Sequence, residues 1–319
     1  MASESGPRLL ADVGATFTRL AVQRPGGTPE AIRVSENDDH SDLACLIENY
    51  LDETTIRPVV AALAVAGPVA GSHVYMPNRG WSFSVAEYRK RLDLEQLVVV
   101  NDFTAVALAI PQLSTADRVQ VGSGQAQADA AIAVLGPGTG LGVSGLVPGT
   151  AGRAPITGEG GHATLAADNE QEEAILGLLR EELGHVSAER VVSGPGLLRL
   201  YQALGRLHGI RADSEFPAEI TRRALSGDDP LAVAALEQFF AWLGSIAGNI
   251  ALILGARGGV YLAGGIVPRL IEPLRRSAFR RRFVAKGRYQ DYLEAIPTFV
   301  ITAEHPALRG LIARLDGKM

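Results

Sequence analysis

The sequence predicts a mixed α/β protein made of two similar halves that face a cleft. Its 319 residues, at roughly 150 residues per domain, predict about two domains. Strand-like and helix-like runs alternate over the first hundred residues, and this rhythm starts again after Pro111. Both halves open with a strand, a turn rich in Gly and Thr, and a second strand, at 9–22 and at 131–146. We therefore expect a small domain over residues 1–110 and a large one over residues 111–302.

In the first half, apolar and β-branched runs predict strands, and amphipathic runs predict helices. The predicted strands are residues 8–13, 18–23, 59–65 and 97–100, and the predicted helices are residues 42–53 and 85–92.

The second half is predicted to be richer in helix. Its predicted strands are residues 130–135, 141–147, 260–263 and 298–302, and its predicted helices are residues 170–180, 194–207, 217–225 and 231–254. A closing helix over residues 306–315 begins with a proline suited to a first helical turn. Its apolar residues recur at helical spacing, so this helix could pack back on the first domain.

One apolar stretch is long enough to suggest a membrane span. Residues 239–256 contain no charged side chain. The length of this stretch is near the length that a helix needs to span a bilayer. The stretch also contains Gly244 and Gly248, and it runs directly into a predicted strand. Two glycines four residues apart lie on one helical face and let another backbone approach closely. We therefore expect a buried helix here.

Composition and charge exclude several classes of function. The chain has 30 Lys and Arg against 35 Asp and Glu, a formal charge of −5, and its longest basic run is Arg280–Arg282. We therefore expect neither nucleic acid nor a membrane as a partner. Cys45 is the single cysteine, so no intrachain disulfide can form. The first eight residues lack the pattern of an export signal, and we expect a cytoplasmic protein.

The glycine-rich turns differ from the familiar nucleotide loops. A dinucleotide-binding or Walker loop needs a helix directly after its glycines, whereas strand-like runs follow both turns here, at 16–22 and 141–147. The amides and Thr hydroxyl of such a hairpin turn can bind phosphate oxygens, and Asp12 at the strand end can hold Mg²⁺ through water. A purely structural tight turn is the alternative for each hairpin. Their joint occurrence with Asp12 and Arg19 favours phosphate binding.

Six motifs together resemble bacterial glucokinases of the hexokinase superfamily. They occur in the order of that family over nearly the whole chain: Asp12-Val-Gly-Ala-Thr-Phe-Thr-Arg19, Asn101-Asp-Phe-Thr-Ala105, Leu135-Gly-Pro-Gly-Thr-Gly-Leu-Gly142, Gly158-Glu-Gly-Gly-His162, His185-Val-Ser-Ala-Glu-Arg-Val-Val-Ser-Gly-Pro-Gly196 and Ala263-Gly-Gly-Ile-Val-Pro268. The resemblance implies two actin-like (ribonuclease H-like) domains around a central cleft, with the helix at about 303–319 belonging to the first. It also implies phosphorylation of glucose at its 6-hydroxyl by ATP with Mg²⁺, and a homodimer.

The resemblance places nucleotide and phosphate contacts in both turns and after a later strand. The expected residues are Asp12, Gly14, Ala15, Thr16 and Arg19 in the first hairpin, Gly136, Gly138, Thr139 and Gly140 in the second, and Gly264 and Gly265 beside the adenosine. A tight strand-to-helix turn at Gly264 is compatible with that role.

Asp102 is the best candidate for the base that accepts the proton of the sugar hydroxyl. It follows the apolar strand 97–100 and would project from the strand end, with Asn101 beside it to bind the sugar. The alternative is an Asx turn or a helix cap before residues 104–110. The family pattern favours the base.

The resemblance completes the glucose site with Glu159, His162 and Glu189, whose side chains suit a polyhydroxyl ligand. Taken singly, each has a structural alternative, such as a surface ion pair between Glu189 and Arg190. Asn78 resembles a further sugar contact, although it is also a good turn residue.

Zinc is not expected. Related sugar kinases and repressors that hold structural zinc carry a cysteine cluster after the equivalent of His162, and residues 163–168 here contain none. Two alternatives to the kinase remain open: a sugar-responsive regulator, which would need a DNA-binding segment ahead of the first strand, and a non-catalytic sugar sensor.

Overall fold

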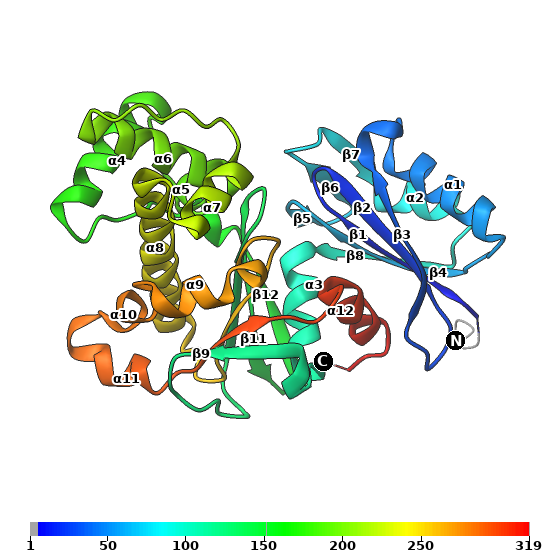
Figure 1. The fold of residues 1–319 in the computed structure, drawn as a ribbon. Coiled ribbons are helices and arrows are strands. Elements are labelled where there is room, and N and C mark those ends of the chain that lie inside the picture. The colour runs from blue at the N-terminus through cyan, green and yellow to red at the C-terminus, as the bar shows by residue number, and fades with distance from the viewer. Residues whose placement is uncertain (1–5, 151, 319) are drawn as a thin grey trace. The chain divides into compact units, whose positions relative to one another are not determined.

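The computed structural model describes residues 6–150 and 152–318, and it is a mixed α/β structure, as predicted (Figure 1). Its backbone contacts divide the chain into two compact units. Unit 1 takes in Met1–Ser114, Gly149–Gly158 and Ala303–Met319, and unit 2 takes in Thr115–Pro148 and Glu159–Thr302. This division by contacts does not test the predicted domain limits, which are residues 1–110 with the helix at about 303–319 and residues 111–302, and they stay a prediction.

Unit 1 contains a five-stranded sheet in the order β3-β2-β1-β4-β8 and a small sheet in the order β5-β6-β7. In the larger sheet β3, β2 and β1 are antiparallel neighbours, while β1, β4 and β8 run parallel. The elements are β1 Arg8–Val13, β2 Phe17–Gln23, β3 Pro29–Glu36, α1 Leu43–Thr54, β4 Val60–Val65, β5 Val69–Ala70, β6 His73–Met76, β7 Trp81–Ser84, α2 Val85–Arg91, β8 Gln96–Asn101, α3 Asp102–Ala109 and α12 Pro306–Leu315.

The second large sheet has the order β12-β11-β10-β13-β14-β9. Its strands are β9 Arg118–Val121, β10 Ile132–Pro137, β11 Leu141–Gly149, β12 Gly152–Thr157, β13 Val260–Leu262 and β14 Thr298–Ile301. The helices of unit 2 are α4 Glu170–Leu183, α5 Ala188–Val191, α6 Gly194–His208, α7 Pro217–Ser226, α8 Pro230–Leu254, α9 Ile271–Arg276, α10 Phe279–Val284 and α11 Gln290–Glu294.

The two large sheets share one strand order over five strands, β3-β2-β1-β4-β8 in one and β12-β11-β10-β13-β14 in the other. In each, an antiparallel hairpin (β1–β2 or β10–β11) is followed across the sheet by two parallel strands, β4 and β8 or β13 and β14. The repeat predicted from the two Gly/Thr turns is therefore confirmed. Parallel strands place their carboxyl ends at one edge of a sheet, where open α/β folds usually bind ligands.

The two faces of β1 pack against different helices of unit 1. Leu9, Ala11 and Val13 belong to the same buried cluster as the inner face of α1. Because side chains alternate along a strand, Asp12 lies on the opposite face. On that face α12 packs against β1 and β4 as well as α3.

Helix α8 is the predicted buried helix. By length and composition it could cross a membrane, but 78% of its most apolar window is buried inside the structure. A Cβ atom on Gly244 would lie 2.2 Å from the carbonyl oxygen of Phe279, and one on Gly248 would lie 2.4 Å from that of Phe283. Both carbonyls belong to α10, so the two glycines admit its backbone as expected.

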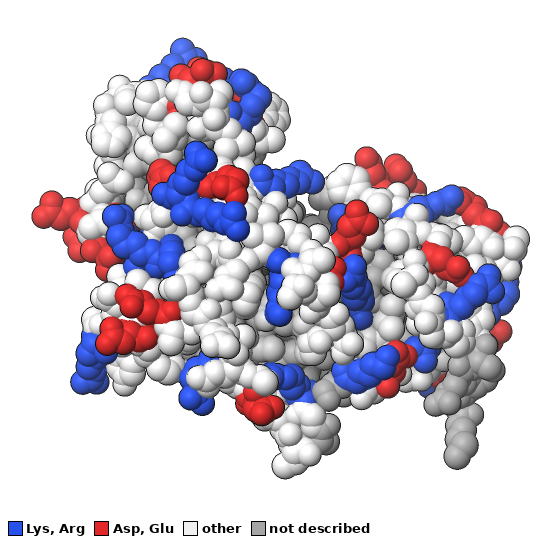
Figure 2. Space-filling view, turned by 60° about the horizontal axis from the view of Figure 1, so that its bottom comes forward, with Lys and Arg blue, Asp and Glu red and all other residues white. Residues whose placement is uncertain are grey.

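The surface charge is mixed. On the face shown in Figure 2, acidic and basic side chains are interspersed, with wide uncharged areas between them. This face carries no continuous basic patch of the kind that grips a nucleic acid backbone.

Candidate functional site

In unit 1 the predicted base and the first phosphate turn follow strands that end at the same edge of the sheet. Val13 of β1 pairs with Val65 of β4, and Val65 pairs with Asn101 of β8, all in parallel register. The turn 14–16 follows β1 and Asp102 follows β8. The sheet therefore brings the catalytic and phosphate-binding candidates of unit 1 to one edge.

The first turn is closed by a hydrogen bond from the Gly14 amide to the Phe17 carbonyl oxygen (3.0 Å). Asp12 and Arg19 face each other across the hairpin, with Arg19 Nη1 3.4 Å from Asp12 Oδ2. Burial raises the pKa of the Asp12 carboxyl above its ordinary value, while the positive charges of Arg19 and His305 oppose that rise. Arg19 therefore has a protein partner already, and its contact with phosphate stays a prediction.

The Asp12 carboxylate suits a Mg²⁺ ion that binds together with a nucleotide, because such an ion needs few ligands from the protein. Such an ion is usually held by one or two carboxylates together with waters and substrate phosphates. Asp12 offers one carboxylate at the end of β1. Within residues 6–150 and 152–318, no three His, Cys, Asp or Glu side chains gather into a site that could hold a metal unaided.

Asn101 is the N-cap of α3, so the capping alternative is true for this residue. Its Oδ1 accepts a hydrogen bond from the Thr104 amide (3.1 Å), and its Nδ2 donates to the Gly67 carbonyl oxygen (3.2 Å). Asp102 is the first residue of the helix, and its Oδ1 accepts from the Phe103 amide (2.8 Å). Both side chains are half-buried, and these contacts fix them at the start of α3.

Asn78 lies in the tight turn between β6 and β7 and is exposed. Met76 pairs with Trp81 across the hairpin, and the amides of Arg79 and Gly80 both donate to the Met76 carbonyl oxygen. The hairpin therefore fixes the backbone that carries Asn78. Its contact with a sugar stays a prediction.

In unit 2 the second turn lies directly against the strand end that carries Gly264 and Gly265. A Cβ on Gly136 would lie 2.5 Å from the Ala263 carbonyl oxygen, and one on Gly264 would lie 2.5 Å from that of Pro137. The turn is closed from the Gly138 amide to the Gly140 carbonyl oxygen (2.8 Å). The nucleotide candidates of unit 2 therefore form one cluster.

Two of the predicted sugar ligands in unit 2 lie beside each other. His162 Nε2 is 3.8 Å from Glu189 Oε1, and the loop after His162 is held to the start of α5 by a hydrogen bond from the Ala188 amide to Ala163 (2.9 Å). Glu159 is exposed, and its carbonyl oxygen accepts from the His162 amide (3.0 Å). The suggested ion pair between Glu189 and Arg190 is not the contact that Glu189 makes.

Glu189 instead bonds to the second phosphate turn. Its Oε2 accepts from the Leu141 amide at 2.9 Å, directly after Gly140. A Cβ on Gly140 would lie 2.4 Å from the same oxygen, so the glycine leaves room for the carboxylate. One carboxylate thus contacts both the sugar candidate His162 and the nucleotide turn.

A sequence model described as "Glucokinase" matches residues 9–317 of the chain. The chain belongs to the glucokinase family. A glucokinase from Aromatoleum aromaticum is 47% identical over 320 residues, which cover 99% of this chain and 97% of that protein. Family membership shows that the chain is an enzyme of sugar phosphorylation, and it does not favour the regulator or the sensor.

Solved structures of glucokinases show the same fold. The glucokinase of an Antarctic psychrotroph has a TM-score of 0.86 and 38% identity, covering 98% of this chain and 99% of that one. A ROK family glucokinase from Streptomyces griseus, solved with glucose and AMPPNP, has a TM-score of 0.67 and 18% identity, covering 97% and 100%. At that identity the second likeness shows the fold alone, which is the two-domain actin-like fold predicted from the sequence.

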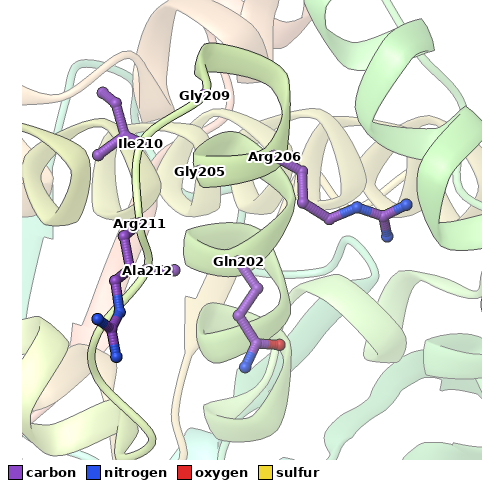
Figure 3. Close-up of a pocket in the computed structure, with 7 residues that line it drawn as sticks. All are labelled: Gln202, Gly205, Arg206, Gly209, Ile210, Arg211 and Ala212. Carbon is purple, nitrogen blue, oxygen red and sulfur yellow. The ribbon is translucent and has the colours of Figure 1, made fainter.

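A hollow of about 520 Å³ lies elsewhere on unit 2 (Figure 3). It is lined by the last turns of α6 and the loop that follows: Gln202, Gly205, Arg206, Gly209, Ile210, Arg211 and Ala212. None of these residues is one of the candidate site residues that the glucokinase motifs identify.

Proposed function

We propose that this member of the glucokinase family transfers the terminal phosphoryl group of ATP to the 6-hydroxyl of glucose, giving glucose 6-phosphate and ADP. The observation that carries the proposal is the position of Asp102 in unit 1, at the same sheet edge as the Gly14–Thr16 turn. In unit 2, the contacts of Glu189 with His162 and with the second turn support the same chemistry. The proposed sugar ligands are Asn78, Asn101, Asp102, Glu159, His162 and Glu189.

The chain's own residues divide the work of phosphoryl transfer. The reaction needs an aligned nucleophile, a proton acceptor and neutralisation of phosphate charge. Asp102 accepts the proton of the 6-hydroxyl, while the polar ligands of the sugar align that hydroxyl. The amides of the two Gly/Thr turns hold phosphate oxygens, and Gly264 and Gly265 leave room for the adenosine. When bound beside Asp12, Mg²⁺ supplies further neutralisation of the triphosphate.

We also propose a cytoplasmic homodimer that carries no zinc. The resemblance to bacterial glucokinases implies the homodimer, the single cysteine fits a reducing compartment, and residues 163–168 contain no cysteine cluster that could hold zinc. Light scattering on the purified protein measures the dimer, and metal analysis measures zinc. Activity should require Mg²⁺ and should be indifferent to a zinc-selective chelator.

Glucose should be preferred over its epimers. An epimer that misplaces one hydroxyl leaves a polar ligand such as Glu159 or Glu189 unpaired, which costs roughly 1–3 kcal/mol, about five- to more than a hundredfold in kcat/KM. Mannose and galactose should therefore be poorer substrates, and N-acetylglucosamine a very poor one. A coupled assay with ATP and Mg²⁺ over a panel of sugars measures these ratios. If mannose or N-acetylglucosamine is used at least as efficiently as glucose, the glucose assignment is wrong even where kinase activity remains.

Gly140→Ala should weaken glucose binding without unfolding the protein. The new methyl group would occupy the place of Glu189 Oε2, and a flexible carboxylate can swing away at little cost to stability. Losing one carboxylate contact with the sugar costs roughly 1–3 kcal/mol, so the KM for glucose should rise about five- to a hundredfold.

Gly138→Ala is the matched control in the same turn. A Cβ at Gly138 meets nothing within 4 Å, and neither Gly138 nor Gly140 has a positive φ. The KM for glucose should therefore stay within about twofold of wild type, whatever happens to the KM for ATP. Equal glucose KM values in the two variants would contradict the role of Glu189.

A further inference from the structure

Three successive carbonyl oxygens of the first phosphate turn accept hydrogen bonds from a single residue, Asn37. Its side-chain Nδ2 donates to the carbonyl oxygens of Gly14 (2.9 Å) and Ala15 (3.2 Å). Its backbone amide donates to the carbonyl oxygen of Thr16 (2.9 Å). Asn37 lies just after β3 and is fully buried. No glucokinase motif in the sequence contains it.

The hydrogen-bond partners of the Asn37 side-chain amide determine which of its ends faces the turn. The carbonyl oxygens of Gly14 and Ala15 can only accept, so the side-chain atom that faces them must be the nitrogen. On the other side, the buried Thr18 hydroxyl donates to Asn37 Oδ1 at 2.7 Å. Thr18 therefore keeps the amide in the orientation that the turn requires.

The side chain of Arg79 holds the backbone of Asn37 in place. Arg79 Nη2 donates to the Asn37 carbonyl oxygen at 2.7 Å, and Arg79 also pairs with Asp38. The guanidinium carbon lies 4.8 Å from the centre of the Trp81 ring, which supports a cation–π contact. Arg79 is the neighbour of Asn78, so the hairpin that carries this sugar candidate also steadies Asn37.

The hydrogen bonds of Asn37 to the turn affect how the turn can bind an anion. Carbonyl oxygens repel phosphate, whereas successive backbone amides form a concavity that binds it. We propose that Asn37 is a positioning residue of the nucleotide site: it holds the three carbonyls on its own side, so that the turn presents its amides and the exposed Thr16 hydroxyl to the phosphates. This inference rests on the proposed ATP-dependent function and adds a residue to it.

The test measures binding of ADP with Mg²⁺ by titration calorimetry in the absence of sugar. Asn37→Ala removes two hydrogen bonds to the turn, and its affinity should fall about ten- to thirtyfold. Thr18→Val keeps the shape but leaves the amide free to turn over, and it should weaken binding about three- to tenfold. Thr18→Ser restores the hydroxyl and should bind within about twofold of wild type. Glucose affinity should stay within about twofold throughout.

Asn169→Ala is the control for loss of stability alone. Asn169 caps α4 in unit 2, where its Oδ1 accepts from the Glu172 amide, whereas the turn belongs to unit 1. It should lower the melting temperature while leaving ADP affinity unchanged. Wild-type ADP affinity in Asn37→Ala, or equal losses for ADP and glucose in that variant, would overturn the inference. Failure of the wild-type protein to bind ADP would overturn the proposed function itself.

Discussion

Replacing Asp102 by Ala should lower kcat by roughly 10² to 10⁴, the usual range for loss of a general base. Without the carboxylate, the 6-hydroxyl must lose its proton to water while it attacks the phosphorus atom. Asp102→Asn is the sharper variant, because its amide oxygen can still accept the hydrogen bond from Phe103 that the carboxylate accepts at 2.8 Å. It keeps the shape of the side chain and removes the basicity. Steady-state kinetics with saturating glucose, ATP and Mg²⁺ measure the effect.

Two controls separate the base from a structural role. Asp102 is the first residue of α3, and a negative charge there is worth roughly 0.3–1 kcal/mol to the helix. Both variants should therefore unfold within about 1 kcal/mol of wild type in urea and should still bind glucose. Turnover near the wild-type rate in Asp102→Asn would remove Asp102 from the reaction.

The strands beside the two glycine turns were predictable because their signal is local. A short apolar run rich in valine, such as residues 59–65, favours a buried strand over a helix, and the structure buries every side chain of β4. The two turns were also predictable from sequence, because each places Gly and Thr between two strand-like runs. Strand β3 was missed because most of its side chains are exposed, and β2 holds it at the sheet edge with little apolar signal of its own.

The candidate site was predictable only through its motifs. Asp102 and Glu189 belong to recognisable segments, whereas Asn37 follows a strand that periodicity does not reveal. The contact between Glu189 and Leu141 joins residues 48 positions apart, so no local pattern shows it. Sequence alone leaves a helix cap and a site role as alternatives for Asn101 and Asp102, and the structure shows that Asn101 forms the cap.

A buried ion pair in unit 2 was likewise invisible in the sequence, since its partners are 110 positions apart. Glu172 of α4 is fully buried and bonds Arg282 of α10 through both oxygens, at 2.7 and 3.0 Å. Gln238 of α8 donates to the same carboxylate at 2.7 Å. Burial alone would raise the pKa of Glu172, but the hydrogen bonds from Arg282 and Gln238 outweigh it and hold the pKa below its ordinary value.

Arg282→Met should lower the free energy of unfolding by about 3–5 kcal/mol at neutral pH, because it leaves the Glu172 carboxylate buried without its counter-charge. Burial raises the pKa of a carboxyl that has lost its counter-charge, so the stranded group takes up a proton above its ordinary pKa. The deficit relative to wild type should therefore shrink as the pH falls toward the ordinary carboxyl pKa. The wild-type pair behaves oppositely: its contribution is present above that pKa and is lost as the pH falls through the lowered one. Urea unfolding at several pH values measures both trends.

The double variant Glu172→Met with Arg282→Met exchanges the pair for apolar side chains and should recover to within about 2 kcal/mol of wild type. Equal stabilities of the single and double variants would show that the unpaired charge is not what destabilises unit 2.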